Sequence, residues 1–294
     1  MGFRIVIINS RCKLETRLNY LVVRGEKEKK IYINEINTLI VQSTAVSLTA
    51  ALLSVLVENN VKIIFCDEKS NPQSELIPYY GAHNTTKRYK WQFCWGNDIK
   101  EKLWQQIIKQ KIFNQSELLK RRGFDKEAQA LLQYAEDVRE GDSSNREGHA
   151  AKVYFNCILP IGISRHGGGF LNGCLNYGYA CLLSAFNREI VAAGLLTQLG
   201  IWHDNEFNQF NFSCDLMEPF RPIVDEAALS LEEGDEQFKR KMANVLNFGV
   251  VVDGIHTTLD LAIRRNVRSV LSVLESGDIS QFSFPREIVA EYEL

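Results

Sequence analysis

The residues whose types and spacing best suit chemistry lie in one short stretch, residues 214–222, which reads CDLMEPFRP. Asp215 and Glu218 are three residues apart, so on a helix their carboxylates lie on one face and can serve a divalent cation or a proton relay. Proline is tolerated in a first helical turn, which predicts a helix that begins near Ser213 or Asp215 and ends at Gly234. Alternatively, Asp215 is an N-cap and Glu218 a partner of the helix dipole. This segment alone leaves both interpretations open.

A second candidate acid is Glu147. Ser144 and Glu147 fit the S-x-x-E capping box, in which the glutamate side chain reaches back to the N-cap N–H. Gly148 follows directly, although a glycine costs roughly 1 kcal/mol of helix stability relative to alanine. Alone, the local pattern favours the cap, but a glycine that clears space beside the acid is a reason to suspect a ligand.

The third candidate is His203, which follows Trp202 and precedes Asp204. A lone histidine is usually a core or surface residue, and its local sequence does not decide otherwise. Glu147, His203 and the pair formed by Asp215 and Glu218 are nevertheless three separate signals, and together they indicate one shared site.

Basic and aromatic side chains alternate over residues 87–91, which read KRYKW. This pattern suits a surface that follows a nucleic acid backbone and stacks on bases, with Lys87 and Arg88 as candidate contacts. Two further basic clusters are solvated helix faces or, alternatively, phosphate contacts: Lys109 with Lys111, and Lys120 with Arg121 and Arg122.

A triple glycine, residues 167–169, precedes a predicted helix. No phosphate-loop pattern surrounds it, so we expect a flexible connection. Asn172, Asn176 and Tyr179 then recur at helical spacing on a helix that also carries a run of apolar residues. Polar groups on such a helix need hydrogen bonds, either from neighbouring side chains or from a bound strand.

The elements that position these residues fall into two parts. We expect an α+β protein with a β-sandwich-like N-terminal domain (residues 1–80), a linker (81–95) and an all-α C-terminal catalytic domain (96–294). In the first domain, residues 43–60 have helical apolar spacing. The predicted strands are Arg4–Ile8, Arg17–Val23, Lys30–Ile33, Thr38–Val41 and Val61–Cys66.

Composition narrows the class of protein. A chain of 294 residues with 45% hydrophobic residues is long enough for two cores, and a net charge of −2 means that a polyanion would need a local basic face. The seven cysteines form no CxxC pair, which argues against a zinc ribbon and a secreted disulfide framework and favours a reduced cytoplasm. There is neither a signal-peptide pattern nor a run of roughly 18 apolar residues, so no membrane association is expected.

Four motifs carry a family resemblance: NREGHAAKVYF at 145–155, LNYGY at 175–179, GIWH at 200–203 and DLMEPFRP at 215–222. With these motifs, in this order, the chain resembles the CRISPR-associated integrase, the larger of the two universal adaptation proteins, in its type II variety. The resemblance covers essentially the whole chain. It implies a strand-rich first domain and a helical second domain.

The resemblance also implies a metal site of Glu147, His203 and Glu218, which would be the catalytic residues, with Asp215 as an outer or alternate ligand. Two carboxylates and an imidazole without a thiolate suit Mg²⁺ or Mn²⁺. Weaker candidates for DNA contacts, beside Lys87 and Arg88, are Arg165, His166, Asn172, Asn176, Tyr177 and Arg221.

The implied reaction joins the 3′-hydroxyl ends of short double-stranded DNA fragments, the spacer precursors, to the CRISPR repeat by transesterification. The implied partners are a second copy of the chain, the small ferredoxin-like adaptation protein, and type II adaptation and effector proteins. Two alternatives remain: a non-catalytic DNA-binding scaffold subunit, and a general metal-dependent DNA-repair nuclease.

Overall fold

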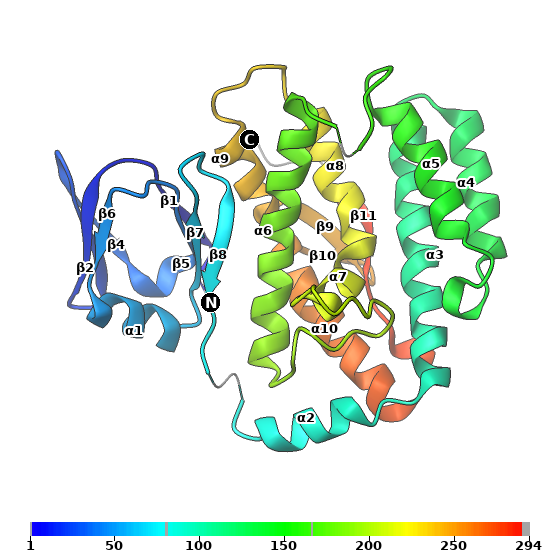
Figure 1. Cartoon of the computed structure of the whole chain (residues 1–294), viewed down its shortest axis with the longest axis horizontal. Helices are drawn as coiled ribbons and strands as arrows, with labels where there is room; N and C mark the ends of the chain where they lie inside the picture. The colour runs from blue at the N-terminus through cyan, green and yellow to red at the C-terminus, as the bar shows by residue number, and fades with distance from the viewer. Residues whose placement is uncertain (1, 80–81, 166, 290–294) are drawn as a thin grey trace. The chain divides into compact units, whose positions relative to one another are not determined.

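The structure is a computed structural model that describes residues 2–79, 82–165 and 167–289. His166, a predicted DNA contact, lies outside the described residues. The chain divides into two compact units, Met1–Tyr79 and Tyr80–Leu294 (Figure 1). Among the described residues, no helix combines the length and the apolar character needed to cross a membrane.

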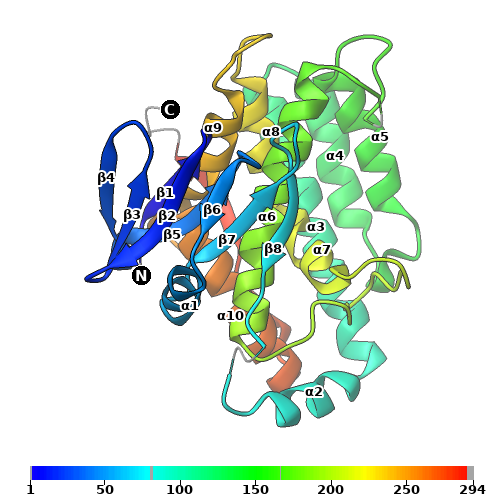
Figure 2. The ribbon, with the colours of Figure 1, turned by 60° about the vertical axis from the view of Figure 1, so that its left-hand side comes forward.

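The first unit contains two four-stranded sheets. One has the order β1-β5-β7-β8, in which β1, β5 and β7 are parallel and β8 is antiparallel to β7 (Figure 2). The other has the order β4-β3-β2-β6. The strands are β1 (Arg4–Ile8), β2 (Cys12–Arg17), β3 (Tyr20–Arg24), β4 (Glu28–Tyr32), β5 (Ile36–Val41), β6 (Val46–Leu48), β7 (Lys62–Cys66) and β8 (Pro72–Leu76).

Both sheets contribute to one core that also includes helix α1 (Ala50–Glu58). Leu14 of β2, Leu39 of β5 and Leu52 of α1 are completely buried there. The predicted β-sandwich-like arrangement is therefore not confirmed, because one sheet is largely parallel and a helix packs into the shared core. The predicted strand Arg17–Val23 is interrupted, since Leu18 and Asn19 have positive φ angles of 49° and 61° and form the turn between β2 and β3.

The second unit is mainly helical. Its helices are α2 (Thr85–Phe93), α3 (Asn97–Arg121), α4 (Asp125–Asp137), α5 (Arg146–Ile158), α6 (Phe170–Ala192), α7 (Asn211–Met217), α8 (Arg221–Leu229), α9 (Phe238–Ala243) and α10 (Leu259–Ser276). Short 3-10 turns occur at Glu140–Asp142 (η2), Glu218–Phe220 (η3), Asn244–Asn247 (η4) and Ile279–Gln281 (η5).

Two expectations for this part of the chain need correction. The domain is not all-α, because β9 (Gly249–Val252) pairs antiparallel with β10 (Ile255–Thr258) and with β11 (Pro285–Val289). The stretch predicted as a linker, 81–95, contains helix α2, which belongs to the second unit. Charged and aromatic residues alternate in α2, so the sequence shows no helical period of apolar residues there and did not indicate that the segment belongs to the second unit.

Two long helices provide the frame of the second unit. Helix α3 buries Leu103, Ile107 and Ile108, as its apolar spacing predicts, and lies beside α4 and α5 (Figure 1). Helix α6 is buried along most of its length and packs against α7, α8 and α10 (Figure 2). The segments that carry the candidate residues are attached to these two helices.

Candidate functional site

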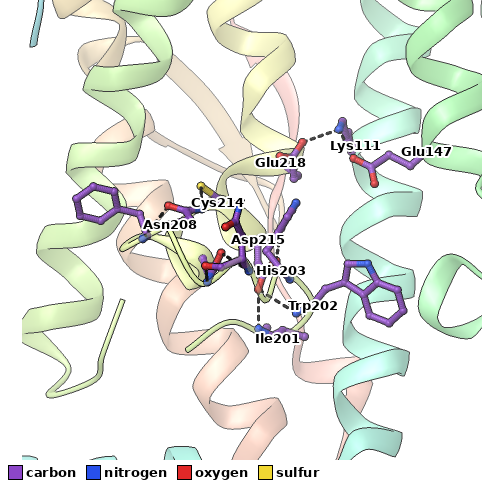
Figure 3. A network of polar contacts seen from close by, with 12 residues as sticks. Lys111, Glu147, Ile201, Trp202, His203, Asn208, Cys214, Asp215 and Glu218 are labelled. Carbon is purple, nitrogen blue, oxygen red and sulfur yellow. Dashed lines mark hydrogen bonds and ion pairs between the residues drawn. The ribbon is translucent and has the colours of Figure 1, made fainter. Parts of the chain in front are cut away.

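The stretch around Asp215 and Glu218 folds as three consecutive helical pieces, α7, η3 and α8. Helix α7 begins at Asn211 and α8 ends at Leu229, so the predicted limits near Ser213 and at Gly234 are shifted. Asp215 lies inside α7 and is not its N-cap, which rules out the capping interpretation. Pro219 occupies the 3-10 turn, where a missing N–H costs little. Figure 3 shows Glu218 directed toward Lys111, whereas Asp215 lies beside Ile201, Trp202 and His203.

Asp215 is completely buried and organises the loop before α7. Its carboxylate accepts hydrogen bonds from the backbone N–H groups of Ile201 (2.5 Å), Trp202 (3.0 Å) and His203 (3.0 Å). Gly200 permits this approach, since a Cβ there would lie 2.6 Å from Asp215 Oδ2 and 2.5 Å from the His203 carbonyl oxygen. The loop therefore depends on one buried carboxylate.

The same carboxylate orients His203. Asp215 Oδ1 lies 2.6 Å from His203 Nδ1, and the edge of the imidazole packs on Trp104 with ring centroids 5.5 Å apart. The hydrogen bond to Asp215 raises the pKa of His203, although burial opposes this, and the charges of Glu218 and Glu147 add to the rise. With Nδ1 engaged, Nε2 is the nitrogen available to a ligand.

Glu147 is not used for capping. The N-cap of α5 is Asn145, whose Oδ1 accepts the Gly148 N–H at 3.3 Å, and Asp142 accepts the N–H groups of Arg146 and Glu147 at 2.8 and 3.0 Å. The predicted capping box with Ser144 is therefore wrong. The interpretation of Gly148 is also corrected, because a Cβ there would lie 2.7 Å from Asn145 Oδ1, so the glycine makes room for the cap.

The carboxylates of Glu147 and Glu218 meet at a lysine from α3. Lys111 Nζ lies 2.6 Å from Glu147 Oε1 and 2.5 Å from Glu218 Oε2, while Arg221 Nε donates to Glu218 Oε1 at 2.9 Å. Burial raises the pKa of Glu218, but the charges of Arg221 and Lys111 outweigh it and lower the pKa to about 2. Burial lowers the pKa of Lys111, and the two glutamates raise it by more.

Three segments distant in sequence thus bring together the residues singled out for chemistry. Figure 3 shows Lys111 between Glu218 and Glu147, with His203 and Asp215 on the adjoining segment. Over residues 2–79, 82–165 and 167–289, no three acidic, histidine or cysteine side chains form a ready-made metal cluster. The donor set still suits a hard cation, because two carboxylates meet at one point and a lysine ammonium, itself a cation, already lies between them.

Several predicted DNA contacts gather around the ring of Tyr179. The guanidinium of Arg221 lies 4.7 Å from the ring centroid and that of Arg165 lies 5.1 Å from it. Arg165 also donates to Asn176 Oδ1 at 2.8 Å and to Asn172 Oδ1 at 3.4 Å. Asn172 is buried and holds the preceding loop through the carbonyl groups of residues 164 and 167.

Other predicted contacts are not brought to this place. Tyr177 is buried and its ring lies edge-on to Phe238, so it does not present a free face. Arg88 pairs with Glu275 of α10 at 2.5 Å and lies over Trp91, and Lys87 is exposed on α2.

The sequence did not single out Asp225, and it named Lys111 only in a basic cluster with Lys109, not as part of this site. Asp225 is buried and accepts hydrogen bonds from the hydroxyls of Tyr154 (2.7 Å) and Tyr179 (2.5 Å). A signal for Lys111 was present, since it follows Ile107 by four residues on the apolar face of α3. A basic residue on a buried helix face needs an acidic partner.

Comparison with known proteins gives one consistent family. The family model described as CRISPR associated protein Cas1 matches residues 5–251. The CRISPR-associated endonuclease Cas1 of Neisseria meningitidis serogroup C (strain 8013) is 30% identical over 302 residues, covering 100% of this chain and 99% of that protein. A Cas1 endonuclease of Francisella tularensis subsp. novicida is 27% identical over 245 residues, covering 75% of each chain.

Solved structures have the same fold at lower identity. A casposase bound to an integration product superposes with a TM-score of 0.78 at 20% identity, covering 94% of this chain and 92% of that one. A Cas1 protein from Thermotoga maritima superposes with a TM-score of 0.73 at 18% identity, covering 93% and 97%. With a family model that spans most of its length and a full-length relative at 30% identity, this chain belongs to the CRISPR-associated Cas1 family.

Proposed function

We propose that the protein is a metal-dependent DNA integrase and endonuclease of CRISPR adaptation, of the type II variety. Three findings support this function: the family match, the endonuclease names of the relatives, and a structural neighbour that is bound to an integration product. In the reaction, the 3′-hydroxyl of a short DNA fragment attacks a phosphodiester of the CRISPR repeat. A new P–O bond forms, the bond to the repeat's 3′-oxygen breaks, and that oxygen leaves as a new 3′-hydroxyl. No ATP is consumed.

One observation carries the proposal: Glu147 and Glu218, from separate segments, both contact Lys111, and His203, on a third segment, is near enough for the charges of both acids to raise its pKa. We assign these three residues as the ligands of Mg²⁺ or Mn²⁺, with Asp215 holding the imidazole so that Nε2 faces the ion. A bound ion would lower the pKa of the attacking hydroxyl and stabilise charge on the phosphorus and on the leaving oxygen.

The residues around the centre would position the DNA. Arg221 and Arg165 lie on Tyr179 beside Glu218, and Asn176 is exposed next to them, so this group suits phosphate groups near the scissile bond. Lys87 and Arg88 on α2 would contact DNA elsewhere. The buried positions of Asn172 and Tyr177 suit support of this surface better than direct contact.

The proposed partners follow from the family. They are a second copy of the chain, double-stranded DNA, the small ferredoxin-like adaptation protein, and the type II adaptation and effector proteins, all in the cytoplasm. A neighbour solved as a Cas6-RT-Cas1--Cas2 complex, with a TM-score of 0.73, supports assembly with other CRISPR proteins.

The test is an integration assay with a labelled DNA fragment, Mn²⁺, and either a CRISPR repeat or a scrambled target. Glu147→Gln, His203→Gln and Glu218→Gln should each abolish joining while DNA binding persists. Glu226→Gln is the matched control, since Glu226 lies on the adjoining helix in an exposed ion pair with Arg121 at 2.8 Å. Joining at the wild-type rate by all three variants would refute their assignment as catalytic residues. DNA binding without joining by wild type would indicate a scaffold subunit, and cleavage without preference for the repeat would indicate a repair nuclease.

A further inference from the structure

The feature that the proposed function leaves unexplained is Lys111. It lies between Ile108 and Ile112 on the face of α3 that is turned into the unit, and only 8% of it is exposed. A buried ammonium is costly unless it is paired. Its two partners, Glu147 and Glu218, are the acids assigned to the metal.

Charges balance within the contacting group formed by Lys111, Arg221, Glu147 and Glu218, which the Asp215–His203 pair adjoins. Glu147 and Glu218 carry two negative charges, and Lys111 and Arg221 carry two positive charges at contact distances of 2.5 to 2.9 Å. A divalent ion bound to both acids would add two positive charges beside the ammonium of Lys111. Like charges at such distances repel strongly where water is scarce.

The two cations differ in how firmly they are held. Arg221 is three residues from Glu218, binds Oε1, and has its guanidinium stacked over Tyr179. Lys111 contacts the other oxygen, Oε2, at 2.5 Å and also donates to Glu147 Oε1 at 2.6 Å, so it bridges the two acids and has no ring beneath it within the described residues. A lysine has a flexible stem and a point charge, so Lys111 is the cation that can leave.

We propose that Lys111 is the resident counter-ion of the acid pair: its ammonium holds the place between Glu147 and Glu218 and must leave it before a divalent ion can join both acids. This inference rests on the proposed function. A phosphate oxygen of bound DNA offers the ammonium a new partner, so metal and DNA should each strengthen the binding of the other. Lys111 would thereby keep the centre inert until substrate is bound.

The test measures Mn²⁺ binding directly, by electron paramagnetic resonance titration of the full chain with and without duplex DNA. Without DNA, Lys111→Met should bind Mn²⁺ more tightly than wild type, by about tenfold. Adding DNA should then strengthen Mn²⁺ binding less in this variant than in wild type. Lys109→Met is the matched control, because it removes the same charge from the same helix and should leave Mn²⁺ affinity unchanged.

Equal or weaker Mn²⁺ binding by Lys111→Met would overturn the inference, and so would an equal gain in Lys109→Met. If the Lys111→Met variant is unfolded when a chelator is present, its refolding on addition of Mn²⁺ is measured instead. Recovery of the folded protein supports the inference, and failure to recover contradicts it. Wild type that binds no Mn²⁺, or Glu218→Gln that binds as tightly as wild type, would instead refute the proposed metal site, and the inference with it.

Discussion

Replacing Asp215 by asparagine should separate the fold of the centre from its ability to bind metal. Oδ2 of Asp215 accepts from Ile201 and Trp202, whereas Oδ1 faces both the N–H and Nδ1 of His203. The side-chain NH₂ of the new asparagine should take the position of Oδ1, because it can donate a hydrogen bond to His203 Nδ1 there. In the position of Oδ2 it would face two N–H donors. With the NH₂ in the position of Oδ1, the imidazole proton would move to Nε2, the nitrogen that we assign to the proposed metal ion.

The contacts set the size of the effect. Hydrogen bonds to a charged group contribute about 1.5–3 kcal/mol each, against about 1 kcal/mol for neutral pairs. In Asp215→Asn, the N–H of His203 loses its acceptor and the two bonds to Oδ2 become neutral. We therefore expect a loss of about 3–5 kcal/mol in the free energy of unfolding. The change of tautomer should weaken Mn²⁺ binding by about 10- to 100-fold.

Urea unfolding, Mn²⁺ titration and strand joining measure the three effects, and ¹⁵N NMR of His203 reports the tautomer. Asp204→Asn is the control, because it makes the same change on an exposed residue of the same loop. If Asp215→Asn kept the Nδ1–H tautomer and bound Mn²⁺ as tightly as wild type, Asp215 would not control the imidazole.

Three further predictions concern the surroundings of the centre. Because the pKa of Glu218 is lowered from 4.5 to about 2, its ionised carboxylate contributes about 3 kcal/mol to the free energy of unfolding above pH 4.5, and this contribution is lost as the pH falls toward 2. In urea unfolding, the stability of Glu218→Gln should not show this fall between pH 4.5 and pH 2. Burial raises the pKa of Asp225 from 3.8 to about 6, so the wild-type protein should gain stability as the pH falls through this window. Asp225→Asn should lack this gain and be up to about 3 kcal/mol more stable than wild type at pH 7. Unfolding curves that shift equally between about pH 4 and pH 7 in both proteins would contradict this prediction. Gly178→Ala should cost about 1–3 kcal/mol in thermal unfolding, because its Cβ would lie 2.5 Å from Val224 Cγ1. Gly173→Ala, with nothing within 4 Å of the new Cβ, is its control, and equal stability of the two variants would refute the packing argument.

Much of the fold follows from periodicity in the sequence. Strand β1 has the limits predicted for it, and the helical spacing of residues 43–60 corresponds to α1, Ala50–Glu58. Errors arise where a few residues change direction, as at Leu18 and Asn19, or where Thr49 caps α1 after the short strand β6. Such turns depend on tertiary contacts that no local period reveals.

The candidate site was predicted through its acids and its histidine, but not through its cation. Glu147 and Glu218 stand out as acids in motifs, whereas Lys111 was grouped with Lys109 as part of a solvated face or, alternatively, a phosphate contact. What distinguishes the two lysines is burial, and burial depends on which face of α3 meets the rest of the unit. The partner of an acid 36 residues away cannot be identified from sequence spacing alone.

Every group assigned to the centre comes from Tyr80–Leu294, and residues before Tyr80 supply none of them. In a calorimetric scan, removing the ion with a chelator should therefore shift the heat-absorption peak of this part only, leaving the transition of Met1–Tyr79 at its original temperature. The transition of the N-terminal unit would then be an internal reference in the same sample for metal binding to the second unit.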